Sequence, residues 1–187
     1  MKRIVSLALA IAFVALVSLK LEAQTFGAPE VMKGKLVVGG DFDLGYAYNC
    51  FYFGLSPQVG YRLTRSLEVG TRLGYNLNYY TDYYYGSYFC HYFSGAIYAN
   101  YEIFRGLYVH VEDEELCALI RGKAVNPTAP SWYNSFFVGG GYRQYFSETG
   151  FVYYSVLYNL SWDYDYTVSG SPYFNPFVIR VGYCKGL

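Results

Sequence analysis

Residues 93–116 read FSGAIYANYEIFRGLYVHVEDEEL, and this stretch decides the fold. Over residues 93–103 the side chains alternate strictly between two faces. One face carries Phe93, Gly95, Ile97, Ala99, Tyr101 and Ile103, and the other carries Ser94, Ala96, Tyr98, Asn100 and Glu102. A period of two is that of a β-strand, and a single apolar face means that only one side of the strand meets an apolar medium.

Residues 104–106 predict a tight turn, because Gly106 supplies the positive φ that such turns often need. The alternation then resumes, with Leu107, Val109 and Val111 on one face and Tyr108, His110, Glu112 and Glu114 on the other. Pairing the two strands about Arg105 sets Glu102 opposite Tyr108, Asn100 opposite His110 and Tyr98 opposite Glu112. The two polar faces therefore form one continuous surface, and the rest of the chain must indicate whether it lies inside or outside.

The amino terminus predicts export. Lys2 and Arg3 precede an uncharged run over residues 4–19, and residues 21–23 end on Ala23, a small residue at a cleavage point. This is the layout of a secretory signal peptide over residues 1–23, with an uncleaved membrane anchor as the alternative. Residues 24–33 carry no periodic pattern and are interpreted as a short periplasmic lead.

The composition of the exported chain indicates a single domain that does not bind nucleic acid. Residues 24–187 amount to 164 residues, which fits one domain. Removal of residues 1–23 takes away three of the 14 basic residues and one of the 14 acidic residues, which leaves a net charge of −2 and no basic surface. The chain has 25 Tyr and 20 Gly, a composition that favours strands with one polar and one apolar face.

The same alternation predicts six further strands. They cover residues 36–46, 51–61, 67–79, 132–146, 151–162 and 173–183. Tight turns are expected at residues 63–66, 104–106 and 147–150, and longer loops at residues 80–88, 121–131 and 163–172. Short and long connections alternate, so the tight turns share one end of the molecule and eight strands return both termini to that end. Pro57 lacks a ladder donor, and we expect a bulge or local break there.

A Val-Gly pair recurs in five strands, at residues 38–39, 59–60, 69–70, 138–139 and 181–182. In every case Val falls on the apolar face and Gly on the polar face. We interpret the glycines as lowering the bulk inside a narrow barrel that long charged side chains crowd.

Charged residues lie on the polar face of most strands. They are Asp41, Asp43, Glu68, Arg72, Glu102, Glu112, Glu114, Arg143 and Arg180. A soluble, lipocalin-like barrel would instead turn its apolar face inward. Aromatic residues, however, gather at both ends of the apolar face, as they do where a barrel wall crosses a bilayer. We therefore predict lipid outside and charge inside, where opposite charges offset part of each other's desolvation.

Asp113 is the exception to this arrangement. Strict alternation points it at lipid near the middle of the bilayer, at a free-energy cost of roughly 2 kcal/mol or more. We expect a bulge at residues 112–115 that turns the carboxylate away from lipid.

In its alternating strands, tight turns and apolar outer faces, the stretch 34–187 resembles the small eight-stranded outer-membrane barrels of Gram-negative bacteria, of the OmpA and OmpX type, and the outer-membrane β-barrel proteins common in Bacteroidota. The fold class expected is all-β, an eight-stranded antiparallel up-and-down transmembrane β-barrel. The resemblance implies a bacterial outer-membrane location, contact with outer-membrane lipid and lipopolysaccharide, and insertion by the barrel-assembly machinery. Such proteins usually finish on an aromatic residue, whereas this chain continues from Tyr183 to Leu187, which weakens that assembly signal.

The inward polar residues have two interpretations. His110 with Glu102, Glu112 and Glu114 has the residue types of an acid–base or metal cluster. We favour a structural ion-pair network that fills the lumen, because inward charges need no catalytic role. The predicted network is Asp41, Asp43, Glu68, Arg72, Glu102, His110, Glu112, Glu114, Arg143 and Arg180.

No other residue pair predicts catalysis. His91 and Ser94 resemble, in residue type, the hydrolytic pair of barrels that deacylate lipid A. At a spacing of three on a strand, however, they point to opposite faces. We therefore expect no catalytic residues, no metal and no cofactor.

The positions of the four cysteines allow one disulfide bond without requiring it. Export would place them in an oxidising compartment. Cys90 and Cys117 are expected near the same end of neighbouring strands, where they could pair, whereas Cys184 lies near the opposite end and is interpreted as a free thiol. No two cysteines have the close spacing of a metal site.

The long loops combine aromatic residues with small polar neighbours, which suits the binding of an extracellular protein or glycan. The candidate recognition residues are Tyr80, Tyr83, Tyr84, Tyr85, Trp162, Tyr164 and Tyr166. A thick interfacial girdle of aromatic residues explains them equally well. We expect a structural or surface-recognition protein of the outer membrane, with a barrel enzyme acting on outer-leaflet lipid, or a narrow pore, as the alternatives.

Overall fold

The computed structural model describes residues 35–47, 49–64, 66–82, 86–122, 129–162, 173 and 176–187. The predicted signal peptide (residues 1–23) and lead (residues 24–33) lie outside the described residues. Within the described ranges, no helix is both long and apolar enough to cross a membrane.

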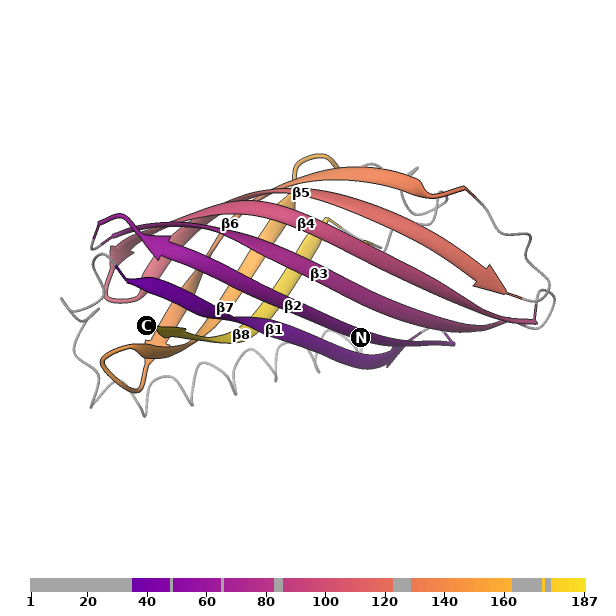
Figure 1. Cartoon of the computed structure of the whole chain (residues 1–187), viewed down its shortest axis with the longest axis horizontal. Helices are drawn as coiled ribbons and strands as arrows, with labels where there is room; N and C mark the ends of the chain where they lie inside the picture. Colours follow the sequence, from indigo (N-terminus) through magenta and orange to yellow (C-terminus); the bar gives the residue numbers. More distant parts are fainter. Residues whose placement is uncertain are drawn as a thin grey trace, which may run out of the picture.

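The described residues form a closed barrel in which each strand pairs antiparallel with the next one along the chain, and the last strand pairs with the first (Figure 1). The strands are β1 (Leu36–Ala47), β2 (Cys50–Arg62), β3 (Leu67–Asp82), β4 (Gly86–Phe104), β5 (Leu107–Gly122), β6 (Ser131–Tyr145), β7 (Gly150–Asn159) and β8 (Phe177–Gly186). The β2–β3, β4–β5 and β6–β7 connections gather at one end of the barrel, on the left of Figure 1. The predicted eight-stranded antiparallel up-and-down fold is confirmed.

The hairpin of β4 and β5 has the predicted register. Glu102 lies opposite Tyr108, Asn100 opposite His110, and Tyr98 opposite Glu112. At the turn, Arg105 and Gly106 have φ values of 39° and 87°. Two successive residues at positive φ match the twist of the flanking strands, which is why this short connection closes the hairpin.

Two strand ends extend beyond their predicted limits. β3 continues to Asp82 and β4 begins at Gly86, so most of the predicted loop at residues 80–88 is strand. Tyr is a good strand former, and the two strands pair continuously up to their ends. β5 likewise continues to Gly122, past the predicted start of a loop at residue 121.

The last two strands are displaced from their predicted positions. β7 ends at Asn159 rather than at residue 162, and β8 covers Phe177–Gly186 rather than residues 173–183. The final residues therefore belong to the barrel wall: Lys185 pairs with Gly150 of β7, and Gly186 pairs with Val37 of β1.

Pro57 produces the predicted local break without a bulge. The β2–β3 ladder is interrupted between the pairs Leu55↔Tyr75 and Gln58↔Arg72 and then resumes in the same register. The missing proline N–H accounts for the gap.

Asp113 points outward and is exposed. The β4–β5 ladder runs through it without interruption, so the bulge predicted at residues 112–115 is wrong. The side-chain amide of Asn134, on β6, instead donates hydrogen bonds to the carboxylates of Asp113 (2.9 Å) and Glu115 (3.1 Å). A polar partner on the next strand thus satisfies the outward carboxylates where a bulge was expected.

The inward glycines accommodate large aromatic rings. A Cβ at Gly70 would lie 2.5 Å from the carbonyl oxygen of Val59 and 2.6 Å from the ring of Tyr98. A Cβ at Gly182 would lie 2.5 Å from the ring of Tyr153. The glycines of the Val-Gly pairs therefore leave room for buried tyrosines as well as for charged side chains.

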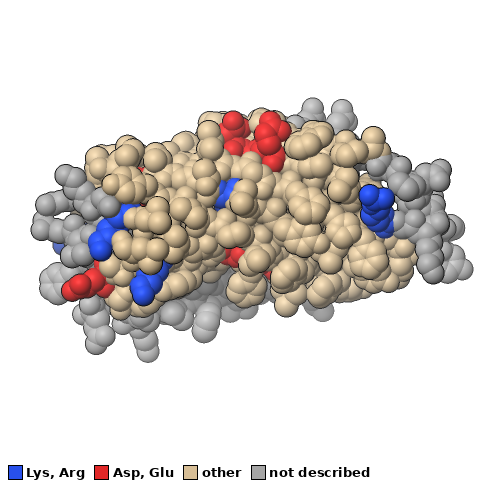
Figure 2. Space-filling model, viewed as in Figure 1, with Lys and Arg blue, Asp and Glu red and all other residues tan. Residues whose placement is uncertain are grey.

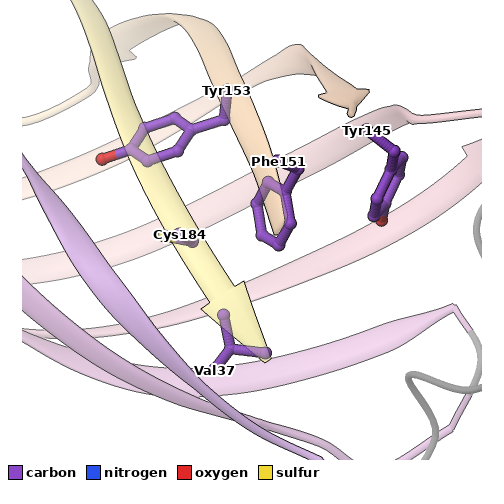
Figure 3. Packing of buried hydrophobic residues seen from close by; sticks show 5 residues of the cluster. All are labelled: Val37, Tyr145, Phe151, Tyr153 and Cys184. Carbon is purple, nitrogen blue, oxygen red and sulfur yellow. The ribbon is translucent and has the colours of Figure 1, made fainter. Parts of the chain in front are cut away.

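An apolar cluster fills the lumen where β1 begins and β8 ends. It consists of Val37, Tyr145, Phe151, Tyr153 and Cys184, contributed by four strands that meet near the barrel end with the tight turns (Figure 3). A second apolar cluster, described below, fills the part of the lumen near the long loops.

The outer wall is apolar over the middle of the barrel. Exposed side chains there include Phe42, Leu73, Ile97, Val111, Val156 and Ile179. Charged side chains are few in the space-filling view: some lie near the two ends, an acidic group lies on the upper edge, and small basic and acidic patches lie near the middle (Figure 2). Large apolar side chains thus cover the surface that a soluble protein would keep polar.

Candidate functional site

The inner wall carries the charged residues that the alternation assigned to it. Strand pleating points every second side chain into the lumen. Nine of the ten predicted network residues are buried there, each no more than 8% exposed; they are Asp41, Glu68, Arg72, Glu102, His110, Glu112, Glu114, Arg143 and Arg180. Their ion pairs form two groups, which we call the turn-side network and the loop-side network.

The turn-side network consists of two arginines and two glutamates from four strands. Arg62 lies 3.3 Å from the carboxylate of Glu68 and 3.5 Å from that of Glu102. Arg143 lies 3.0 Å from Glu68 and 3.7 Å from Glu102. Each carboxylate therefore lies between two guanidinium groups, which offsets the desolvation of all four charges.

Glu102 also ties the turn-side network to the tight turn. Its carboxylate accepts a hydrogen bond from the backbone N–H of Gly106 (3.0 Å) and another from the hydroxyl of Tyr145 (3.1 Å). Tyr145 in turn accepts a hydrogen bond from Arg62 at 2.6 Å. The network thus fixes the β4–β5 turn to the barrel interior.

Glu112 is the centre of the loop-side network. Arg180 donates two hydrogen bonds to its two oxygens, at 2.8 and 2.9 Å, and Arg72 donates a third at 2.8 Å. The Nε2 atom of His110 lies 3.3 Å from the same carboxylate. Bidentate arginine–carboxylate geometry is among the strongest polar contacts in proteins.

Two further carboxylates flank this centre. Asp41 and Glu114 each lie 3.8 Å from Arg72. Each also accepts a hydrogen bond from a tyrosine hydroxyl, Asp41 from Tyr153 at 2.6 Å and Glu114 from Tyr173 at 2.5 Å. Arg72 is therefore surrounded by three acidic groups.

Asn100 connects the two networks. Its amide nitrogen donates to Glu68 at 3.2 Å, and its oxygen lies 2.6 Å from Nδ1 of His110. A cavity of about 20 Å³ lies among residues of both networks. That volume holds about one water molecule.

Nδ1 of His110 lies within hydrogen-bond distance of Asn100, whereas Nε2 lies 3.3 Å from the Glu112 carboxylate and forms no hydrogen bond within the described residues. Within the described part of the chain, no group of three or more His, Cys, Asp or Glu side chains is arranged to hold a metal ion. The arrangement can neutralise buried charge and brace opposite walls of the barrel.

Aromatic residues close the lumen above the loop-side network. Cys90, Tyr92, Leu116 and Ala118 are buried together, and Tyr80, Tyr88, Ile120, Tyr133 and Tyr173 pack against them. The rings of Tyr80 and Tyr88 stack with centroids 5.0 Å apart. Tyr80 therefore lies in β3, partly buried against this cluster, rather than in the predicted loop, and its role in recognition stays a prediction.

The remaining predicted site residues that the structure describes lie outside the two ion-pair networks. Asp43 faces the lumen side of β1 but is exposed and forms no ion pair within the described residues. Trp162 is partly buried, and its indole N–H donates to the carbonyl oxygen of Tyr173 at 3.2 Å. The other loop candidates, Tyr83, Tyr84, Tyr85, Tyr164 and Tyr166, lie outside the described residues.

The disulfide bond that the sequence allows between Cys90 and Cys117 is not formed. Cys90 is buried on the inner face of β4, whereas Cys117, opposite Phe93, lies on the outward face of β5. All four cysteines are free, including Cys184, whose sulfur is 2.8 Å from the amide nitrogen of Gln58.

Sequence reasoning missed several members of the networks, chiefly Arg62, Asn100, Tyr145 and Tyr153. Arg62 lies on the inner face of β2 together with Gln58. The two-residue alternation of the strand could therefore have identified Arg62, despite its position beside a turn. No signal in the sequence singles out the tyrosines, because Tyr occurs on both faces of the strands.

Neither a protein-family model nor a curated protein matches the chain. A solved structure does: the crystal structure of the N-terminal β-barrel domain of Pseudomonas aeruginosa OprF aligns over 83% of this chain and 98% of that one. The TM-score is 0.50 and the sequence identity is 15%. What the two share is the fold. The resemblance expected from the sequence is thereby confirmed at the level of an eight-stranded outer-membrane barrel fold.

Proposed function

We propose that this protein is an integral β-barrel of a bacterial outer membrane, with a structural role, a surface-recognition role or both, and no catalytic activity. The observation that carries the proposal is the inversion of polarity: buried ion pairs fill the lumen and apolar side chains cover the outer wall. Lipid stabilises such an outer wall, whereas water would not. The partners that follow are outer-membrane lipid and lipopolysaccharide, and the barrel-assembly machinery for insertion.

The lipid-facing wall is tested by Val156→Arg. Val156 is 53% exposed, lies in the middle of β7 and is paired with Gly140 and Ile179. We expect the variant to lose about 2–4 kcal/mol of stability in phospholipid vesicles, the loss typical of an arginine at mid-bilayer. Urea titration of the folded fraction measures it. Phe146→Arg, in the exposed β6–β7 turn, is the control and should change stability by less than about 1 kcal/mol. Equal, small effects at both positions would contradict a lipid-facing wall.

A filled lumen argues against a pore. Two ion-pair networks and the aromatic cluster above them fill much of the lumen in the described part of the chain, and the cavity between the networks has a volume of about 20 Å³. We expect no stable conductance when the purified protein is reconstituted in planar bilayers. A general porin serves as the positive control, and reproducible conductance steps would overturn this part of the proposal.

Two facts support a non-catalytic role. His91 faces outward, with Nδ1 3.1 Å from the hydroxyl of Tyr75, whereas Ser94 lies on the other face of β4. His110 is buried inside the loop-side network. Lipid A isolated from cells with and without the protein should have the same acyl chains; a missing or added chain would favour a lipid-modifying enzyme.

Surface recognition through the Tyr-rich loops requires that these loops face the outside of the cell, which cysteine labelling can test. In a variant lacking the native cysteines, Tyr84→Cys should react in intact cells with a thiol reagent that cannot cross the outer membrane. Arg105→Cys, in the tight turn at the opposite end, should react only after lysis. The reverse labelling pattern would place the tight turns at the cell surface and exclude the Tyr-rich loops as extracellular recognition elements.

A further inference from the structure

The barrel is closed over only part of the height of β1 and β8. These strands pair from Val37↔Gly186 to Asp41↔Gly182, and no pair follows. β1 nevertheless continues to Ala47 along β2. β8 likewise begins at Phe177 and pairs with β7. Residues 42–45 of β1 and residues 178–181 of β8 therefore present strand edges toward each other that are not paired. In Figure 1, β1 and β8 lie close together at the lower left and diverge toward the right.

Glycines mark the point where the strands part. A Cβ at Gly182 would lie 2.5 Å from the carbonyl oxygen of Gly40, so the two backbones approach closely there. Beyond this contact β1 follows β2 and β8 follows β7. Glycine at such a point allows a strand to bend, as at barrel corners.

The two unpaired edges are complementary. Continuing the existing register sets Phe42 opposite Val181, Asp43 opposite Arg180, Leu44 opposite Ile179 and Gly45 opposite Val178. The outward residues are all apolar and exposed. Of the two inward pairs, Asp43 with Arg180 combines an acid with a base, and Gly45 with Val178 is uncharged. Asp43 is also the predicted network residue that has no ion pair within the described residues.

We propose that the β1–β8 seam is a lateral gate: the barrel alternates between the open seam of this structure and a closed state in which residues 42–45 and 178–181 pair. In the open state Arg180 binds Glu112 across the lumen. In the closed state Asp43 becomes a second carboxylate beside Arg180, so closure adds to the loop-side network. Lipid favours closure because it cannot hydrogen-bond to free strand edges. This inference goes beyond the proposed function, which stands whether or not the seam moves.

Cross-linking tests the closed state. In a cysteine-free variant folded in lipid vesicles, Leu44→Cys with Ile179→Cys is treated with a short, membrane-permeable bifunctional thiol reagent. The matched control is Val38→Cys with Lys185→Cys. These residues are already opposite each other in the ladder and face outward, as Leu44 and Ile179 do. We expect the gate pair to reach the same final yield about twofold more slowly, as for a closed state that is populated near one half. No cross-link at the gate, or a rate equal to the control, would overturn the proposal.

Asp43→Asn provides the second measurement. It should slow cross-linking at the gate several-fold and leave the control pair unchanged, because closure sets the Asp43 carboxylate directly opposite Arg180 and the amide removes that attraction. An unchanged rate at the gate would exclude the role of Asp43 in closure.

Amide hydrogen exchange on the unmodified protein keeps the proposal testable if the cysteine-free variant does not fold. The carbonyl of Leu36 accepts a hydrogen bond from the N–H of Leu187, the residue that follows β8, and even-numbered residues of β1 therefore turn their backbone groups toward β8. We expect the amides of Phe42 and Leu44 to exchange faster than those of Asp43 and Gly45, which bond to β2, yet slower than free amides. Exchange at the free rate, or protection equal to that of Val38, would overturn the gate.

Discussion

Replacing Glu112 by Gln is expected to destabilise the folded barrel by about 3–5 kcal/mol, the range for removing one partner of a buried ion pair. Glu112 is 1% exposed and receives three hydrogen bonds from two arginines. It provides the only ion pair of Arg180 among the described residues. The variant would leave that guanidinium charged and buried without a counterion.

The measurement is urea unfolding of the refolded protein in vesicles, followed by tryptophan fluorescence. Glu114→Gln is the matched control, because Glu114 approaches Arg72 only to 3.8 Å. We expect it to lose less than about 2 kcal/mol. The double variant Glu112→Met, Arg180→Met should be more stable than Glu112→Gln, since it removes both charges. A loss below about 0.5 kcal/mol for Glu112→Gln would mean that water, rather than the carboxylate, compensates the arginines.

Replacing Gly70 by Val is expected to destabilise the barrel by more than about 3 kcal/mol, at or beyond the upper end for overpacking in a protein interior. The new Cβ would lie 2.5 Å from the carbonyl oxygen of Val59, a backbone atom that the β2–β3 ladder holds in place. The ring of Tyr98 lies on the other side at 2.6 Å. Neither the backbone nor the buried ring can move away without breaking pairs.

Gly95→Val is the control for the same change on the other face. Gly95 is exposed on the outer wall of β4, and a Cβ there meets nothing within 4 Å. Its stability in vesicles should stay within about 1 kcal/mol of the unmodified protein, with a gain where the β-branched side chain suits the strand. Equal losses at both glycines would mean that strand flexibility, rather than inward crowding, explains the Val-Gly pattern.

Alternation along the chain was sufficient to predict the strands, their faces and one register in detail. The hairpin at residues 93–116 has the register that its sequence predicts, with the polar faces of the two strands opposite each other. The ladder reaches this register through a one-residue shift between Glu102 and Phe104, beside the two-residue turn, which the sequence did not predict. Strand ends were less predictable. The extension of β3 and β4 past residue 80 depends on each strand having the other as a partner, which no local signal reports.

The candidate site was predictable in composition but not in its connections. The alternation of side chains along β5 and β8 assigned Glu112 and Arg180 to the lumen. It could not predict that they form an ion pair, because they are 68 positions apart in the sequence. The hydrogen bond between Tyr153 and Asp41 spans 112 positions. Such pairs depend on how the eight strands are staggered when the barrel closes, a property of the whole sheet.

The amino-acid sequence alone was enough to establish which side chains face outward and which face the lumen, because the two-residue period of a strand is a local property of the backbone. Contacts between residues far apart in the sequence were decided only when the barrel closed. These contacts are the ion pairs, the packing of tyrosine rings against glycines, and the length of the β1–β8 ladder. Those outcomes follow from stagger and curvature, which arise only when all eight strands are assembled.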